Sequence, residues 1–258
     1  MGRGGFFSIS KGTKVILAIT LSVSLLAVFA AYLYYGDLNK REDPRIRKAK
    51  EFLVLFEKES GKINTLPYFY LLDSANVIFR SVPDYKTSFE PGLIYNNKCS
   101  SLLMVAIYDS TANREEKNKL LDIAMKYCDS SIVVYKSWIS DWEKLSYEEI
   151  AERISVHMND SDKVFEGLNF RRIFEKRVKD IMAAQIETPR RLSVSLTNKG
   201  TIYRHQLLVD SALSCYNKSL LIWKDNRTAK SNLSVLMGGE PVKPSIIESL
   251  FPPDKNKK

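Results

Sequence analysis

The chain opens with one long apolar run and continues with a stretch in which apolar residues recur at helical spacing. Residues 15–35 contain no Asp, Glu, Lys or Arg, and Tyr32, Tyr34 and Tyr35 stand at the C-terminal end of this run. A bilayer core about 30 Å thick needs roughly 20 apolar residues in a helix that rises 1.5 Å per residue, and tyrosines gather at the membrane interface. The run therefore predicts a transmembrane helix at residues 15–35.

The segments that flank the run bear on processing and orientation. Residues 1–14 form a short basic tail, and residues 36–45 form a polar linker. A signal peptide has a shorter apolar region of about 7–15 residues, and this run continues past the loosely matching cleavage site at Ala30, so we expect an uncleaved anchor. The larger number of basic residues after the run would keep the domain in the cytoplasm, whereas long domains translocate largely regardless of charge. We favour a single-pass membrane protein, in the inner membrane if the source is bacterial, with its domain in the periplasm or exterior and a cytoplasmic domain as the alternative.

Apolar residues in the segment 46–240 recur three and four positions apart, and alternating β-branched runs are few. This pattern predicts an all-α domain built from helical hairpins. The expected helices are 46–58, 68–80, 92–109, 116–142, 147–157, 170–186, 191–205, 209–223 and 227–237, with Pro189 between two of them. The Pro- and Lys-rich tail at 241–258 is expected to be disordered.

Charge and cysteine content narrow the classes of function. The net charge is +9, but 39 Lys and Arg residues interleave with 30 Asp and Glu residues. Such mixing indicates solvated helix faces and no nucleic-acid-binding stripe. The chain has an odd number of cysteines, Cys99, Cys128 and Cys215. They lack the spacing of a metal site and fall within helical apolar patterns. We therefore expect three small buried hydrophobic side chains and no structural disulfide.

A set of small and large residues near the C-terminal end has a regular spacing. Its members are Leu196, Gly200, Tyr203, Ala212, Tyr216 and Leu220. This spacing resembles the tetratricopeptide repeat (TPR) family, in which small residues let two antiparallel helices approach and aromatic residues fill the gap to the next hairpin. The sequence departs from the family at Leu207, where a turn Gly is usual, at Ser219, where Ala is usual, and at Lys224, where Pro is usual.

Weaker echoes of the same spacing occur upstream. Asn97, Lys98 and Cys99 parallel Asn198, Lys199 and Gly200, and residues 131–138 parallel 212–219. The resemblance implies a transmembrane helix followed by a TPR-like array of antiparallel helical hairpins over residues 46–240. An ordinary bundle of amphipathic helices is the alternative.

The resemblance also implies a binding groove. In TPR arrays the first helix of each hairpin lines a concave surface, where an Asn often contacts an extended peptide, and Asn97, Asn198 and Asn232 stand at the matching phase. An amide side chain both donates to and accepts from a peptide backbone. The nearby Arg191, Arg204 and His205 would favour an acidic segment. Hydrogen bonds between helices and a solvated charged face are the alternatives for these two sets.

The family resemblance implies a membrane-anchored scaffold that binds a protein partner and supports assembly of a membrane complex, such as secretion, envelope or flagellar-motor machinery. The sequence has no H-E-x-x-H, G-x-S-x-G or phosphate-cradling glycine motif. We therefore expect no catalysis, no cofactor and no metal, and leave homo-oligomerisation open. The alternative is a helical enzyme or ligand-binding domain whose site is formed by residues distant in sequence.

Overall fold

Every regular element in residues 11–60, 62 and 64–243, the part of the chain that this computed structural model describes, is a helix. The helices are α1 (Lys11–Lys40), α2 (Arg47–Glu59), α3 (Phe69–Ser81), α4 (Pro83–Lys86), α5 (Glu90–Tyr108), α6 (Arg114–Trp142), α7 (Tyr147–Ser155), α8 (Phe170–His205), α9 (Val209–Ile222) and α10 (Arg227–Leu236), with 3-10 turns η1 (Leu66–Tyr68) and η2 (Lys163–Phe165). The all-α prediction is confirmed.

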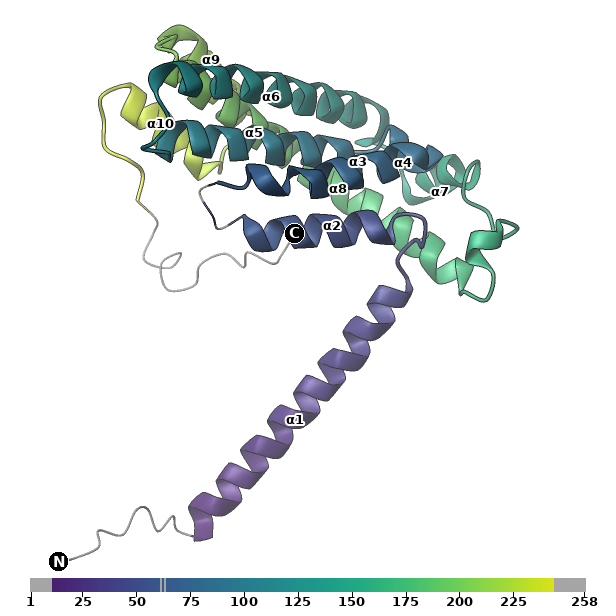
Figure 1. The fold of residues 1–258 in the computed structure, drawn as a ribbon. Helices are drawn as coiled ribbons and strands as arrows, with labels where there is room; N and C mark the ends of the chain where they lie inside the picture. The colour runs from purple at the N-terminus through teal and green to yellow at the C-terminus, as the bar shows by residue number, and fades with distance from the viewer. Residues whose placement is uncertain (1–10, 61, 63, 244–258) are drawn as a thin grey trace, which may run out of the picture.

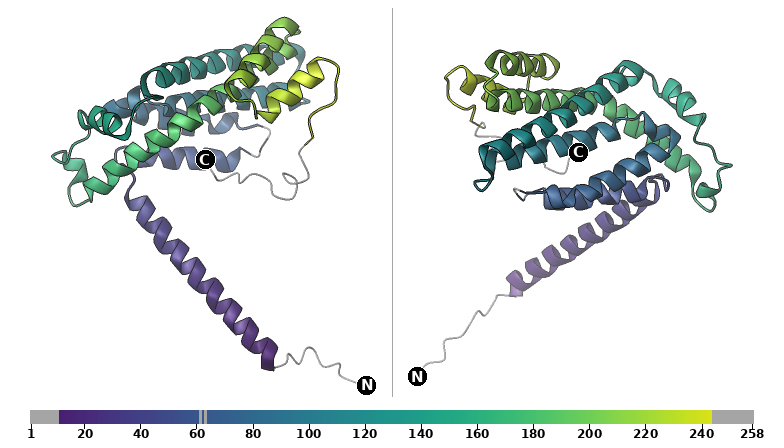
Figure 2. Two further views of the ribbon diagram at one scale, coloured as in Figure 1. Left: turned by 180° about the vertical axis from the view of Figure 1, so that it is seen from behind. Right: turned by 45° about the horizontal axis from the view of Figure 1, so that its top comes forward.

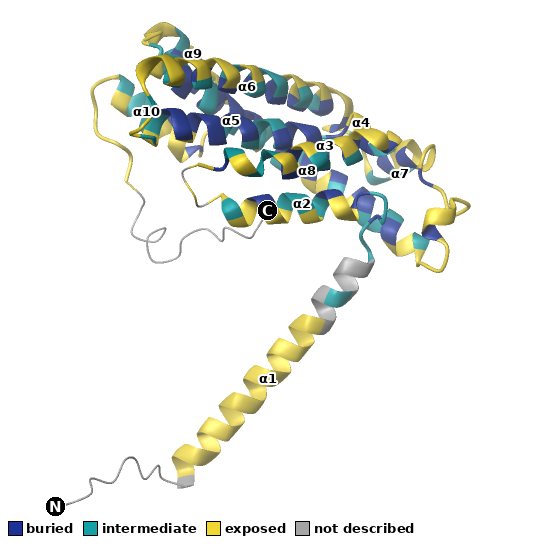
Figure 3. Cartoon of the chain, in the orientation of Figure 1, coloured by how far each residue is buried: buried dark blue, intermediate teal, exposed yellow. Residues whose placement is uncertain are grey.

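Helix α1 projects away from the remaining helices (Figure 1). Its segment Gly12–Tyr32 has a mean hydropathy of 2.4, is long and apolar enough to cross a membrane, and is not buried by the rest of the protein (Figure 3). The helix continues to Lys40, so the predicted linker 36–45 begins inside it. Most of the predicted N-terminal tail, residues 1–10, and most of the predicted disordered tail, residues 244–258, lie outside the described residues.

The long helices of the domain pack as antiparallel pairs, α2 with α3, α5 with α6 and α8 with α9 (Figures 1 and 2). Between pairs, α3 contacts α5 and α6 contacts α8, while α10 packs on α9 and α8. Each helix carries an apolar stripe that one neighbour covers only in part, and the next helix covers the remainder. The three antiparallel pairs are therefore successive both in sequence and in space.

Helix α5 lies at the centre of this arrangement and is buried on most sides. It packs directly against α6 at Gly92, where an added Cβ would lie 2.5 Å from Cε1 of Tyr135. Tyr135 is fully buried. The phenol ring therefore occupies the space that a side chain at position 92 would need.

Helix α8 corrects the expected break at Pro189. It runs through Pro189 as one helix of 36 residues. On the N-terminal side of the proline, Val178 and Ile181 pack with the tryptophans of α6, and on the C-terminal side Leu192 and Leu196 pack further along the same helix. Packing of both halves against α6 offsets the cost of an internal proline, about 3 kcal/mol.

Candidate functional site

Three of the positions predicted for helix packing, Gly200, Ala212 and Tyr216, lie at the contact between α8 and α9. A Cβ added to Gly200 would lie 2.7 Å from Cε1 of Tyr216, closer than side chains pack. Ala212 and Tyr216 of α9 are fully buried. Gly200 therefore allows the backbone of α8 to lie directly against the tyrosine ring.

The other three packing candidates have different surroundings. Leu196 is buried against Ile132 and Tyr135 of α6. Tyr203 is half-buried, with the Lys199 ammonium 5.7 Å from the centre of its ring, and Leu220 is half-buried on α9. Three of the six positions thus lie between α8 and α9, Leu196 packs against α6, and Tyr203 and Leu220 are only half-buried.

A buried cluster of hydroxyl groups joins α8, α9 and α10. The Asn226 amide donates to Oγ of Ser193 at 2.9 Å, Oγ1 of Thr197 at 3.0 Å and Oγ of Ser219 at 3.1 Å. Its Oδ1 accepts from the backbone N–H of Ala229 and so caps the first turn of α10. Sequence reasoning missed this cluster, and its one local signal was an Asn immediately before a predicted helix.

The three asparagines proposed for the groove are not brought together. Asn198 donates to Oδ1 of Asn96 on α5 at 3.2 Å, and Asn232 donates to Oγ1 of Thr201 on α8 at 3.1 Å. Both amides therefore form hydrogen bonds between neighbouring helices. This is the alternative to peptide binding that the sequence left open for these asparagines. Asn97 lies apart from them, in a cleft between α2 and α5.

The lysines that follow two of these asparagines make equivalent contacts. Lys98 of α5 pairs with Asp73 of α3, and Lys199 of α8 pairs with Asp129 of α6, each with an N–O distance of 2.5 Å. In both cases the lysine contacts the second helix of the preceding antiparallel pair, which is α3 for Lys98 and α6 for Lys199. The sequence parallel between residues 97–99 and 198–200 therefore has a counterpart in the packing.

The cleft that contains Asn97 is lined mostly by polar residues. Its lining residues are Phe56, Glu57, Ser60, Lys62, Thr65, Asn97, Ser100, Ser101 and Met104. Oγ1 of Thr65 is buried and has no hydrogen-bond partner among the described residues. This cleft can accept a small polar group, but it holds only one of the predicted groove residues.

A second cleft lies between the α5–α6 turn and the α8–α9 turn. Both turns are at the end of the domain opposite the junction between α1 and α2 (Figure 1). Its lining residues are Ala106, Arg114, Lys117, Asn118, Leu121, Asp122, His205, Gln206, Leu207 and Leu208. Gln206 donates to Oδ1 of Asp122 at 3.0 Å and so ties the two turns together. Arg114 and Lys117 leave the cleft with basic character.

One wall of this second cleft is an exposed apolar turn. Leu207 is 79% exposed, and Leu208 and Val209 follow it at 49% and 52%. Leu207 has a φ of 62°, which is the left-handed region that glycine favours and leucine avoids. The turn therefore has a backbone conformation that glycine adopts more readily than leucine.

Of the three predicted basic residues, only His205 lines this cleft. Partial burial, with the neighbouring charge of Arg204, lowers the pKa of His205 below its ordinary value, so the imidazole is neutral near pH 7. Arg191 lies elsewhere, with its guanidinium 5.4 Å from the centre of the Phe89 ring. These residues do not form one basic groove.

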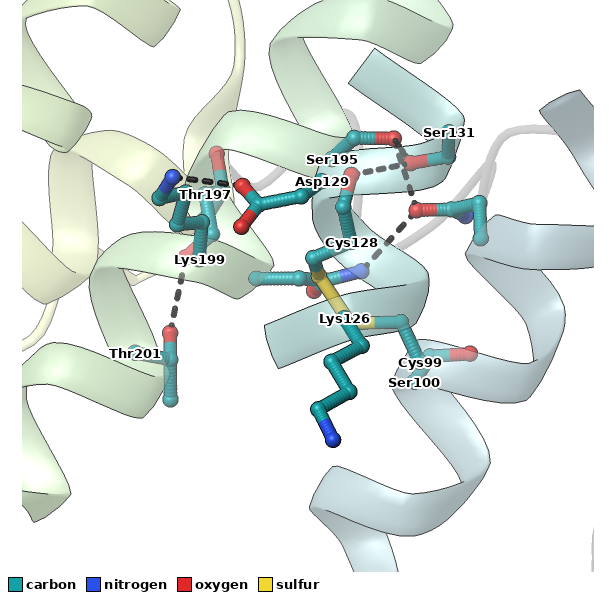
Figure 4. Close-up of a disulfide and its surroundings, with 12 residues drawn as sticks. Cys99, Ser100, Lys126, Cys128, Asp129, Ser131, Ser195, Thr197, Lys199 and Thr201 are labelled. Carbon is teal, nitrogen blue, oxygen red and sulfur yellow. Dashed lines mark hydrogen bonds and ion pairs between the residues drawn. A yellow bond between two sulfur atoms is a disulfide. The ribbon is translucent and has the colours of Figure 1, made fainter. Parts of the chain in front are cut away.

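A disulfide joins Cys99 of α5 to Cys128 of α6, which corrects the expectation of three free thiols (Figure 4). The two Cα atoms are 5.4 Å apart because these positions lie directly opposite in the antiparallel pair. Cys215 is free and buried, and its burial raises the pKa of its thiol. The bridge lies beside the hydrogen bond between Ser131 and Ser195, which joins α6 to α8.

Within residues 11–60, 62 and 64–243, no group of three or more His, Cys, Asp or Glu side chains is placed to hold a metal ion. The chain matches no protein-family model, no curated protein and no solved structure.

Proposed function

We propose that this chain is a single-pass membrane protein whose domain, a TPR-like array of helical hairpins, holds a protein partner near the bilayer. The exposed apolar helix α1 supports the anchor. The antiparallel pairs, the close contact at Gly200 and the equivalent Lys98–Asp73 and Lys199–Asp129 pairs support a repeated unit.

The observation that carries the proposal is the turn formed by Leu207, Leu208 and Val209. Three consecutive large apolar side chains are exposed there, and the first of them has a backbone conformation that costs a non-glycine residue about 1–2 kcal/mol. A strained, exposed leucine is explained when its side chain makes a contact outside the chain. The turn therefore marks the edge of a partner-binding cleft.

The charges of the same cleft indicate the kind of partner. Arg114 and Lys117 stand opposite the apolar turn, and Asp122 is engaged by Gln206. Asn198 and Asn232 already bond to neighbouring helices, so the cleft takes the place of the predicted asparagine groove. The partner is a protein segment with apolar residues flanked by acidic ones.

A photo-crosslinking amino acid at position 207 tests the proposal in the native cell. We expect a discrete protein adduct at position 207 and none at position 221, because Leu221 is an equally exposed leucine, at 86%, on the same pair of helices. The adduct protein is then titrated onto the full chain in nanodiscs. Leu208→Asp should weaken its binding roughly tenfold, the loss of about 1.4 kcal/mol expected for one apolar contact. Equal adducts at both positions, or unchanged affinity in the variant, would refute the proposal.

The disulfide supports an exported domain. Such bonds persist in oxidising compartments and are rare in the cytosol. The buried bridge between Cys99 and Cys128 therefore favours the periplasm or exterior over the cytoplasm. Protease added to intact cells, with and without permeabilisation of the outer barrier, tests this orientation, and a domain digested only after the membrane that holds α1 is breached would overturn it.

A further inference from the structure

The chain turns back on itself after α10. Oγ of Ser234 donates to the carbonyl oxygen of Glu240 at 2.7 Å, and the backbone N–H of Val242 donates to Oγ of Ser231 at 3.3 Å. Because the later residue bonds to the earlier position on α10, residues 240–242 run antiparallel to the helix. The described part of the chain, which ends at residue 243, therefore ends beside α10.

The second cleft lies within reach of this point, since α10 is at the same end of the domain as the α5–α6 turn (Figures 1 and 2). Asn232 of α10 donates to Oγ1 of Thr201 at 3.1 Å, and Thr201 stands one helical turn before His205, which lines the cleft. These successive contacts place Val242 within about 25 Å of His205. An extended chain covers about 3.3–3.6 Å per residue, so eight residues span about 26–29 Å. Residues from about position 250 onward can therefore enter the cleft.

The sequence beyond residue 243 contains a segment of the kind proposed for the partner. Leu250 and Phe251 form an apolar pair, with Glu248 before it and Asp254 after it. The two prolines between Phe251 and Asp254 favour an extended chain. The three lysines among residues 255–258 follow Asp254, so the charges that flank the apolar pair are acidic. We refer to residues 248–254 as the acidic–apolar segment.

The charges of the cleft complement this segment. Arg114 and Lys117 lie in the first turn of α6, where the helix dipole disfavours a positive charge. Among the residues that the structure describes, neither forms an ion pair, whereas the neighbouring Glu115, Glu116 and Asp122 are each engaged by another group of the domain. The two basic side chains are therefore the charges of the cleft that lack a counterion.

We infer that the acidic–apolar segment occupies the second cleft in the free protein, with its apolar pair against the turn that Leu207 begins and its carboxylates beside Arg114 and Lys117. A short tether gives the segment an effective concentration in the millimolar range, so a weak contact is enough to keep the cleft filled. A protein partner must displace the segment in order to bind. This last step alone rests on the proposed function, because occupation of the cleft by the segment needs no partner.

The test uses the purified full chain in nanodiscs with no partner present. A photo-crosslinking amino acid stands at position 207, and the matched control carries it at position 221, where the native leucine is equally exposed. We expect mass spectrometry to find the peptide that contains Leu250 and Phe251 crosslinked to position 207 and not to position 221. A mixture of isotope-labelled and unlabelled chains separates a crosslink within one chain from a crosslink between two copies.

Paired substitutions in the same experiment test which residues fill the cleft. Leu250→Glu with Phe251→Glu should lower the crosslink yield at least about tenfold. Ile246→Glu with Ile247→Glu is the matched control, since it adds the same charge to an apolar pair outside the segment, and it should leave the yield unchanged. Raising the salt from 0.1 M to 1 M shortens the screening length from about 10 Å to about 3 Å and should also lower the yield.

The displacement step is tested with the partner that the cellular adduct at position 207 identifies. A segment that fills the cleft about nine-tenths of the time lowers the apparent affinity for a competing partner about tenfold. The chain with Leu250→Glu and Phe251→Glu should therefore bind this partner about tenfold more tightly than the wild type does. An unchanged affinity would mean that the partner and the segment do not compete.

Three results would overturn the inference: equal crosslinking from positions 207 and 221, crosslinks that join labelled to unlabelled chains, and a crosslink that Leu250→Glu with Phe251→Glu leaves unchanged. A partner adduct in cells, without the segment crosslink in the purified chain, would overturn the inference and leave the proposed function standing. The segment crosslink without any partner adduct would support occupation of the cleft and count against the proposed function.

Discussion

Replacement of Leu207 by glycine tests the strain at the α8–α9 turn. The left-handed φ of 62° costs leucine about 1–2 kcal/mol, whereas glycine adopts it freely. Glycine also makes the unfolded chain more flexible, which costs about 0.5–1 kcal/mol. The side chain of Leu207 is 79% exposed, so its removal takes away little buried area. We therefore expect Leu207→Gly to raise the free energy of unfolding by about 0.5–1 kcal/mol.

The assay is urea unfolding of the full chain in nanodiscs. The unfolding is monitored by circular dichroism at a wavelength that reports helix content. The matched control is Leu208→Gly, because Leu208 has an ordinary φ of −91° and is 49% exposed. This control should lower the free energy of unfolding by about 0.5–1 kcal/mol. Equal losses in both variants would refute the strain argument. If Leu207 serves the partner, Leu207→Gly should also weaken partner binding while it stabilises the fold.

Three further changes probe the packing and charges of the domain. Gly200→Ala should lower the free energy of unfolding by about 1–3 kcal/mol, measured by the same urea titration, because the new methyl group meets a buried tyrosine ring. Replacement of both Cys99 and Cys128 by serine should lower it by about 3.5 kcal/mol, since the bridge closes a loop with a sequence separation of 29. Arg177→Met should cost about 3–5 kcal/mol near pH 7, because it leaves the buried carboxylate of Glu90 without its partner at 2.8 Å.

The ion pair between Glu90 and Arg177 also predicts how the stability of the fold depends on pH. Burial alone would raise the pKa of Glu90, but the charge of Arg177, the hydrogen bond from Ser88, the charge of Lys50 and a backbone hydrogen bond together hold this pKa below its ordinary value of 4.5. A lowered folded-state pKa stabilises the protein above the unfolded-state pKa, and this contribution is lost as the pH falls through the folded value. Unfolding titrations between pH 7 and pH 3 should show this loss in the wild type and a smaller loss in Glu90→Gln. Equal pH dependence in the two proteins would contradict the assignment.

Two results would contradict the packing predictions. A Gly200→Ala variant as stable as the wild type would mean that α8 and α9 separate at no cost. Serine variants of the two bridge cysteines that unfold at the same urea concentration as the wild type would mean that the bridge does not constrain the unfolded chain.

The helices and the span were predictable because both leave a local signal. An apolar residue every three or four positions marks a helix, and the expected bounds of most helices agree with the structure within about two residues. The predicted break at Pro189 was wrong. The rule that a proline ends a helix considers only local sequence, whereas the continuity of α8 depends on packing along α6. The Cys99–Cys128 bridge had no local signal, since the two positions meet only when α5 and α6 take their register.

The candidate cleft could be recognised from the sequence only in part. Leu207 stood out because a Gly was expected at that turn, yet its φ and exposure come from the structure. Arg114 and Lys117 could not be associated with it, because they follow a different hairpin turn and reach the cleft through the packing of α6 on α8. Asn226 joins its hydroxyl partners for the same reason, across three helices.

The unbroken course of α8 has a mechanical consequence. Lys176, near its N-terminal end, is paired to Glu42 just after the proposed anchor, and His205, at its other end, lines the proposed partner cleft. The two residues are 29 positions apart on one helix, a length of about 44 Å. A force applied at the cleft is therefore transmitted to the base of α1 through one continuous helix, with no intervening loop. We expect tension from a bound partner to tilt the anchor, and a change in the tilt of α1 in oriented bilayers upon partner addition would measure that torque.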